Sequence, residues 1–178
     1  MKQVSSGLLA KVLRHNPEIL GLSLSTGSWA EIEDLCRRLR KYGRQANSEI
    51  LNDIARKDDK QRFTISDDGL RIRAAQGHSF GADLELTAKE PPQILLHGTS
   101  RDRLDDIWAG GLLPKGRDYV HLSLDKKTAE QVGSRHGKVV VLEVSALEMH
   151  ADGFAFYLAD NGVWLTSKVP TKYLGFVP

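Results

Sequence analysis

The stretch Ala88-Lys89-Glu90-Pro91-Pro92-Gln93 divides the sequence into two differently patterned halves. Two consecutive prolines supply no backbone N–H donors and have a restricted φ, so this segment cannot continue a helix or a central strand. Helical apolar patterns dominate before it, and β-branched runs dominate after it. We therefore expect two lobes, residues 1–88 and residues 93–178, each with its own core.

In the first lobe, three apolar stripes with helical spacing predict three helices. The stripes are formed by Leu8, Leu9, Val12 and Leu13, by Ile32, Leu35, Cys36 and Leu39, and by Ile50, Leu51 and Ile54. The region from Pro17 to Gly21 should end the first helix. Ser28-Trp29-Ala30-Glu31 has the form of a capping box before the second helix, and Gly43 is placed to cap its C-terminus. The third helix should begin near Asn47.

After the third predicted helix, the spacing of apolar residues changes from helical to alternating. Phe63-Thr64-Ile65 and Leu70-Arg71-Ile72 flank Ser66-Asp67-Asp68-Gly69, which predicts a β-hairpin. Three helices followed by a hairpin are the outline of a winged helix, a frequent nucleic-acid-binding module, and this comparison rests on analogy. A small α+β domain whose basic residues are merely solvated fits the same pattern.

The second lobe is rich in strands, and its irregular order of strands and short helices favours an α+β fold. Strands are predicted at residues 94–97, 120–123, 138–144, 155–158 and 163–166, and helices at 101–109 and 125–135. The pair Gly110-Gly111 should close the first of these helices. No Gly-rich phosphate loop, paired-cysteine metal motif or nucleophile elbow is present in the sequence, so nucleotide triphosphatase, metal-hydrolase and serine-hydrolase readings are not supported.

Composition places the chain in the ordinary globular range, with 178 residues, 40% of them hydrophobic and 27% charged. No run of apolar residues is long enough for a membrane span, and the N-terminus lacks the apolar core of a signal peptide. Cys36 is the single cysteine, which excludes an internal disulfide. We expect a cytoplasmic protein. Basic residues exceed acidic ones in residues 1–62, a weak sign of a polyanionic partner.

Two kinds of residue could carry chemistry. Arg14-His15, Arg62 and Arg117 are cations, and a guanidinium fits phosphate oxygens while imidazole can move a proton near neutral pH. His97-Gly98-Thr99 follows an apolar run and is expected at a strand end, where flat polar ligands can bind, and His121-Leu122-Ser123 repeats the arrangement. Taken singly, each cation also fits an ordinary surface residue, and each histidine fits a hydrogen-bonded core position.

Six segments in this order resemble the NAD-dependent RNA (tRNA) 2′-phosphotransferases. They are Leu13-Arg14-His15, Lys60-Gln61-Arg62-Phe63, Gln76-Gly77-His78-Ser79, His97-Gly98-Thr99, Arg117 with Val120-His121-Leu122-Ser123, and Asn161-Gly162-Val163-Trp164-Leu165-Thr166. The resemblance covers nearly the whole chain. It implies a winged-helix-like RNA-binding lobe over residues 1–88 and an ADP-ribosyltransferase-like NAD-binding lobe over residues 93–178.

The resemblance also implies a reaction. An internal RNA 2′-phosphate, as left at a tRNA splice junction by certain ligases, attacks C1″ of the nicotinamide ribose of NAD and expels nicotinamide. The 2″-hydroxyl of the transferred ADP-ribose then attacks the phosphate, which releases 2′-hydroxyl RNA and ADP-ribose 1″,2″-cyclic phosphate. NAD is consumed, and no metal, membrane or obligate protein partner is expected.

Residue roles follow from the same resemblance. The catalytic set falls on Arg14, His15, Arg62 and Arg117, which would meet in a cleft between the lobes next to NAD. The NAD pocket would be lined by His97, Gly98, Thr99, His121, Ser123 and Val163. Where many protein ADP-ribosyltransferases have a catalytic glutamate, this chain has Val163, which suits a substrate that brings its own anionic nucleophile. Gln76 and His78 are assigned to RNA or interlobe contacts.

Two other functions remain open at this stage. One is an ADP-ribosyltransferase that modifies nucleic-acid phosphate ends or a protein and stops after the first transfer. The other is a non-catalytic winged-helix protein that binds nucleic acid, needs no NAD and tolerates loss of His97. The reaction products separate the three possibilities.

Overall fold

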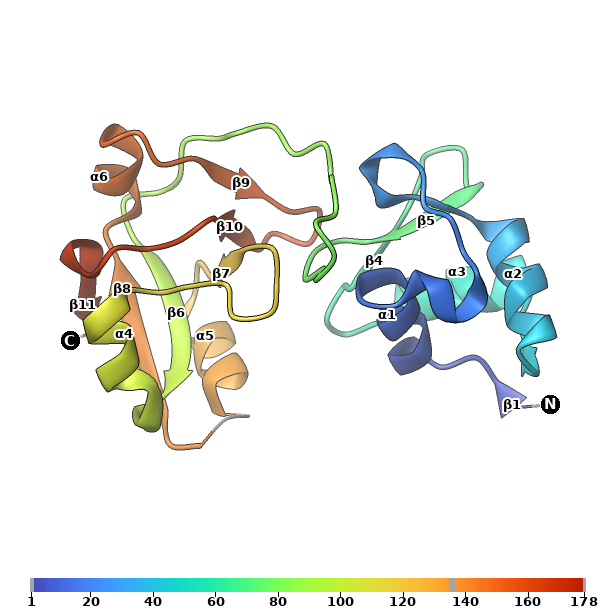
Figure 1. The fold of residues 1–178 in the computed structure, drawn as a ribbon, viewed down its shortest axis with the longest axis horizontal. Helices are drawn as coiled ribbons and strands as arrows, with labels where there is room; N and C mark the ends of the chain where they lie inside the picture. The colour runs from blue at the N-terminus through green and yellow to red at the C-terminus, as the bar shows by residue number, and fades with distance from the viewer. Residues whose placement is uncertain (1, 135–136, 178) are drawn as a thin grey trace. The chain divides into compact units, whose positions relative to one another are not determined.

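The computed structural model describes residues 2–134 and 137–177 of the chain. It divides into two compact units, Met1–Glu85 and Leu86–Pro178, coloured from blue to green and from green to red in Figure 1. Both units combine helices with small sheets, so the mixed α and β class predicted from the sequence is confirmed. None of the described helices is both long and apolar enough to cross a membrane.

The first helix of the first unit agrees with its apolar stripe. Helix α1 spans Ser6–Arg14, and the Ser5 side chain caps it by accepting a hydrogen bond from the Leu8 backbone N–H at 3.2 Å. A 3₁₀ turn, η1 (Pro17–Leu20), follows and ends at Gly21, whose φ of +59° belongs to the left-handed region. The predicted stop between Pro17 and Gly21 is confirmed.

The predicted capping box before the second helix is wrong. Helix α2 (Ile32–Lys41) has Glu31 at its N-cap position with no side-chain cap bond. Ser28 belongs to the 3₁₀ turn η2 (Thr26–Ser28) and donates a hydrogen bond from Oγ to the Asp83 carbonyl at 3.2 Å. The short strand β2 (Ala30–Glu31) lies between them and pairs with a distant strand, because a sheet partner satisfies its backbone groups better than a local cap. Gly43 does follow the helix C-terminus as predicted, with a φ of +79°.

The third helix and the hairpin are confirmed. Helix α3 spans Ser48–Lys57, and Asn47 caps it by accepting from the Ile50 N–H at 2.8 Å. Strands β4 (Phe63–Ile65) and β5 (Arg71–Ala74) form the hairpin, and β2 extends it into a sheet of order β2-β5-β4. A second pair, β1 (Lys2–Gln3) with β3 (Arg44–Gln45), was not predicted.

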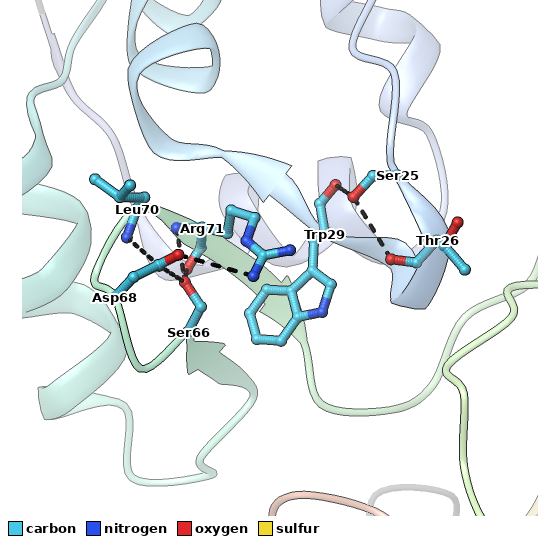
Figure 2. A network of polar contacts seen from close by, with 7 residues as sticks. All are labelled: Ser25, Thr26, Trp29, Ser66, Asp68, Leu70 and Arg71. Carbon is cyan, nitrogen blue, oxygen red and sulfur yellow. Dashed lines mark hydrogen bonds and ion pairs between the residues drawn. The ribbon is translucent and has the colours of Figure 1, made fainter.

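Arg71 connects the turn of the hairpin with Trp29, the residue before β2 (Figure 2). Asp68 accepts hydrogen bonds from Ser66 Oγ at 2.6 Å and from the Leu70 N–H at 2.9 Å, and it pairs with Arg71 at 3.8 Å. The Arg71 guanidinium lies 5.5 Å from the ring centre of Trp29. These contacts fix the turn, while the core beneath the sheet is formed by apolar residues of all three helices.

The second unit contains two three-stranded antiparallel sheets, of order β11-β8-β6 and β7-β10-β9. Their strands are β6 (Leu95–Ser100), β7 (Val120–Leu122), β8 (Val139–Val144), β9 (Phe156–Leu158), β10 (Trp164–Thr166) and β11 (Leu174–Phe176). Leu96 and Ser123 connect the sheets by exchanging backbone hydrogen bonds of 2.8 Å in each direction. All five predicted strands are present, and β11 was not predicted.

Helices of the second unit are short. They are α4 (Leu104–Gly110), which follows the 3₁₀ turn η3 (Arg101–Arg103), α5 (Lys126–Gly133) and α6 (Ala146–Ala151), with a further turn η5 (Thr171–Tyr173). Helix α5 begins as predicted after Asp125, which accepts from the Thr128 N–H at 2.8 Å. Arg135, the predicted end of this helix, lies outside the described residues. Helix α6 was not predicted.

Candidate functional site

Arg62 is held by a buried carboxylate. Asp58 follows helix α3, and its side chain is 2% exposed against 24% for Arg62. It accepts the Arg62 backbone N–H at 2.8 Å and the guanidinium Nε–H at 3.0 and 3.1 Å, with a further short contact to Nη2. Gln61, in the left-handed region with a φ of +45°, closes this turn by donating its N–H to the Asp58 carbonyl. The guanidinium therefore has a fixed orientation before any ligand arrives.

Arg14 contributes to the same electrostatic environment. Burial on its own would raise the pKa of Asp58, but hydrogen bonds from Arg62 and the charges of Arg62 and Arg14 together hold this pKa below its usual range. Asp58 is consequently ionised at neutral pH. Two guanidiniums thus act on one carboxylate, which leaves this part of the first unit with an excess of positive charge.

His15 lies next to Arg14 at the end of helix α1. It is exposed, and its Nδ1 lies 2.9 Å from Ser79 Oγ. The Ser79 backbone N–H donates to the Arg14 carbonyl at 3.1 Å. Two bonds therefore join the segment after the hairpin to the end of α1, and they orient the imidazole.

Gln76 and His78 lie on this same segment. The Arg62 carbonyl accepts a hydrogen bond from the Ala75 N–H at 2.9 Å, and Ser79 contacts α1, so the segment runs between Arg62 and His15. The Gln76 side chain is half-buried and that of His78 is 2% exposed. The structure thus brings together the predicted residues Arg14, His15 and Arg62, with Gln76 and His78 on a neighbouring segment.

In the second unit, the imidazole ring of His97 is neutral and can both donate and accept a hydrogen bond. Its Nδ1 lies 3.0 Å from the His121 backbone carbonyl, and because a carbonyl can only accept, Nδ1 carries the proton. Burial lowers the pKa of His97, outweighing the opposite effect of this hydrogen bond. At neutral pH the ring is uncharged, and Nε2 keeps a lone pair that can accept a hydrogen bond.

The expectation that His97 ends a strand is wrong. Strand β6 continues to Ser100 because it pairs with β8 over its whole length, from Leu95 opposite Val144 to Ser100 opposite Val139. A Cβ at Gly98 would lie 1.7 Å from the Ala129 carbonyl oxygen of α5. Since successive strand residues face opposite sides, His97 and Thr99 point away from α5. Thr99 is 5% exposed.

The N–H and carbonyl groups of Gly98 are directed away from β8. Leu96 directs its N–H and carbonyl to Ser123, away from β8, and residues two apart in a strand direct their polar groups to the same side. The N–H and carbonyl of Gly98 therefore point toward the sheet edge that leads to β7. An N–H donor and a carbonyl acceptor therefore lie side by side at this edge, on the residue that follows His97.

The remaining predicted residues of the second unit occupy three other places. His121 and Ser123 lie on and directly after β7, beside β6. Val163 is half-buried and precedes β10, in a turn where the Ala159 N–H donates to its carbonyl at 2.9 Å. Arg117 is exposed, in the loop between α4 and β7. Its approach to Arg14, His15 and Arg62 stays a prediction, as do the roles of all these residues.

Comparison with known proteins supplies the family. Residues 2–168 match the family model described as RNA 2′-phosphotransferase, Tpt1 / KptA family. The chain belongs to this RNA 2′-phosphotransferase family. Among its relatives, proteins named "Probable RNA 2'-phosphotransferase" from Agrobacterium fabrum and from Pectobacterium carotovorum are 50% and 49% identical, covering 98% and 97% of this chain and 94% of each relative. One from Acaryochloris marina is 47% identical over 97% of this chain and 95% of its own length.

Two residues of this RNA 2′-phosphotransferase chain were not predicted from the sequence as part of the site. Asp58 is the C-cap residue of α3 and precedes Arg62 by four residues, and a lone acidic residue at this place gives no distinct signal in the sequence. Ser79 ends the segment Gln76-Gly77-His78-Ser79, and only the fold brings its hydroxyl to His15.

Proposed function

We propose that this chain removes an internal 2′-phosphate from RNA by transferring it to the ADP-ribose part of NAD. The observation that carries the proposal is the oriented guanidinium of Arg62, grouped with Arg14 and His15 in a chain of the RNA 2′-phosphotransferase family. A phosphate monoester carries a charge of about −1.5 to −2 at neutral pH, and such a charge needs fixed cations.

NAD would supply an ADP-ribosyl group whose bond to nicotinamide is easily broken. An oxygen of the RNA 2′-phosphate attacks C1″, and the electron pair of the broken bond leaves with nicotinamide. In the second step the 2″-hydroxyl attacks phosphorus, and the bond to the RNA 2′-oxygen breaks. The proton of that hydroxyl ends on the RNA oxygen, which gives 2′-hydroxyl RNA and ADP-ribose 1″,2″-cyclic phosphate.

Cations of the first unit would hold the phosphate through both steps. Arg62 presents the N–H groups that Asp58 does not use, and Arg14 adds a second charge. Charge-assisted hydrogen bonds of this kind contribute about 1.5–3 kcal/mol each. His15, oriented by Ser79, would donate a proton or bind a phosphate oxygen in the second step. Arg117 would add a further cation from the second unit.

Neutral groups of the second unit would bind NAD. The carboxamide of nicotinamide has one acceptor and two donors, which match the N–H and carbonyl of Gly98 at the edge of β6. Nε2 of His97 would accept a hydrogen bond from a ribose hydroxyl. This fit supports NAD as the co-substrate and the ADP-ribosyltransferase-like assignment of residues 93–178.

The RNA-binding role of the first unit is part of the proposal. Three helices and the sheet β2-β5-β4 give the outline of a winged helix, and the surplus of basic residues lies in the same part of the chain. Among RNAs we propose tRNA carrying a splice-junction 2′-phosphate, as the resemblance implies, and the cytoplasm as the compartment, as expected from the single cysteine. That no metal takes part stays a prediction.

The test uses a short RNA with one labelled internal 2′-phosphate, incubated with the protein with and without NAD. We expect label to move into ADP-ribose cyclic phosphate only when NAD is present. Arg62→Ala should slow this transfer at least tenfold, since about 1.4 kcal/mol of lost transition-state stabilisation already has that effect. Arg56→Ala, an exposed arginine on α3, is the matched control.

Two results would contradict the proposal. A stable ADP-ribosyl adduct as the final product of the unsubstituted protein would indicate an ADP-ribosyltransferase that stops after the first step. RNA binding without any NAD consumption would indicate a binding protein. In His15→Ala, by contrast, accumulation of ADP-ribosylated RNA followed by slow release is the expected behaviour.

A further inference from the structure

Asp58 is the one buried carboxylate among the residues that the structure describes, and it contacts Arg62. We propose that Asp58 is a positioning residue, whose carboxylate orients the Arg62 guanidinium so that its outer edge binds the RNA 2′-phosphate. This inference rests on the proposed function. The inference goes beyond the proposed function because Asp58 touches no reacting atom and would act only through Arg62.

The hydrogen bonds divide the guanidinium into two edges. Asp58 contacts Nε and Nη2, and it also accepts the Arg62 backbone N–H, so three contacts fix both ends of the arginine. Within residues 2–134 and 137–177, Nη1 of Arg62 has no hydrogen bond or ion pair. A guanidinium has five N–H groups in one plane, so this contact leaves the edge formed by Nη1 and Nη2 for a second acceptor. Phosphate oxygens fit such an edge bidentately.

Burial explains why the contact can orient a long side chain. An exposed arginine samples many rotamers, and ordering it on ligand binding costs free energy. The Asp58 side chain is 2% exposed, so it has few alternative positions and water competes little for its oxygens. Orientation of Arg62 is thus established during folding, and less is lost when the phosphate binds.

A neighbouring ion pair on helix α3 shows how the Asp58–Arg62 contact differs from an ordinary exposed one. Asp53 and Lys57 on α3 have the same spacing of four residues and a contact of 2.9 Å, but their side chains are 46% and 76% exposed. Exposed pairs of this type contribute little to stability. Asp53 is therefore a matched control that carries the same chemical change at an exposed position.

The experiment is a double-mutant cycle measured as the single-turnover rate of 2′-phosphate removal at saturating NAD. Asp58→Asn keeps the shape of the side chain and an oxygen for the Arg62 backbone N–H, but it removes the charge that holds the guanidinium. We expect a loss of tenfold or more in the otherwise unsubstituted protein. In the Arg62→Ala background the same substitution should change the rate by less than twofold, because its target is already gone.

Equal fractional losses in both backgrounds would overturn the inference, since a purely structural role does not depend on Arg62. An unchanged rate in Asp58→Asn would overturn it as well. Asp53→Asn should leave the rate unchanged, and a loss there equal to that of Asp58→Asn would also count against Asp58. If Asp58→Asn does not fold, Asp58→Glu, which keeps the charge but displaces the oxygens, enters the same cycle with the same criteria.

Failure of the proposed function gives a different result. If the unsubstituted protein leaves the 2′-phosphate in place with NAD present, the function and the inference that rests on it both fail. If the unsubstituted protein is active and the cycle shows no coupling, the function stands and only the role of Asp58 is rejected.

Discussion

In the first unit the candidate ligand groups are cationic side chains held by a buried carboxylate, whereas in the second they are a neutral imidazole and the backbone edge of a strand. The first arrangement depends on a turn of five residues, Asp58 to Arg62, and on one contact with Ser79. The second depends on pairing between strands far apart in sequence. The difference teaches that this chain builds its two sets of candidate groups in different ways: fixed charge in one unit, fixed hydrogen-bond geometry in the other.

The largest expected effect concerns the second unit. Gly98→Ala would place a Cβ 1.7 Å from the Ala129 carbonyl oxygen, so α5 must move away from β6. We expect a loss of about 3 kcal/mol in the free energy of unfolding, at the upper end for overpacking. Gly175→Ala on β11, where no atom lies within 4 Å of the added Cβ, is the control. Equal denaturation midpoints for the two variants would show that α5 does not depend on Gly98.

Arg117→Ala tests whether the second unit also supplies a catalytic cation. The single-turnover rate of phosphate removal should fall at least tenfold, equivalent to about 1.4 kcal/mol of transition-state stabilisation. Lys115→Ala changes an exposed cation of the same loop, paired with Asp106 at 3.4 Å, and should have no such effect. An unaltered rate in Arg117→Ala would confine the catalytic cations to the first unit.

A smaller effect is expected at Ser79. Ser79→Ala removes the hydroxyl at 2.9 Å from His15 Nδ1, and a neutral hydrogen bond contributes about 0.5–1.5 kcal/mol. The second step should slow by about two- to tenfold, with ADP-ribosylated RNA visible in a quenched time course. Ser25→Ala, which removes a bond from an exposed hydroxyl to the Trp29 carbonyl, serves as the control. If His15 is oriented without Ser79, both variants will behave like the unsubstituted protein.

The smallest expected effect is on the acid stability of the first unit. The pKa of Asp58 is lowered in the folded state, so the unfolded chain binds its proton first as the pH falls. The stabilisation by Asp58 is therefore complete above the unfolded pKa of about 4 and is lost as the pH falls below it. Melting temperatures measured from pH 6 to pH 3 should fall more steeply for the unsubstituted protein than for Asp58→Asn. Parallel curves would mean that Arg62 and Arg14 do not stabilise the ionised form.

Local signals account for the elements that were predicted correctly. Asn47 caps α3, Asp125 caps α5, and the turn Ser66 to Gly69 closes the hairpin, because each depends on residues within one or two turns of chain. The capping box at Ser28 failed for the opposite reason. The residues following it form β2, which pairs with β5 about forty residues later, and this pairing outweighs the local preference.

In the candidate site, too, local signals were predicted correctly and long-range contacts were not. Arg14, His15 and Arg62 were predicted, but their grouping requires Arg14 to lie near Asp58 and Ser79 to contact His15, and both join segments that are far apart in sequence. His97 was predicted at the end of a strand and lies within one, since its apolar run gave no indication that β8 would pair as far as Ser100.

The sequence by itself determined most helices and strands and the resemblance that the family comparison confirmed, because periodicity, caps and short motifs depend on neighbouring residues. Only the tertiary structure decided that Asp58 is buried near Arg14 as well as Arg62, that His97 carries its proton on Nδ1, and that Gly98 directs its polar backbone to a sheet edge. Each of these depends on which groups become neighbours after folding. Hydrogen-bond partners and burial, the two quantities that set orientation and protonation, are properties of those neighbours.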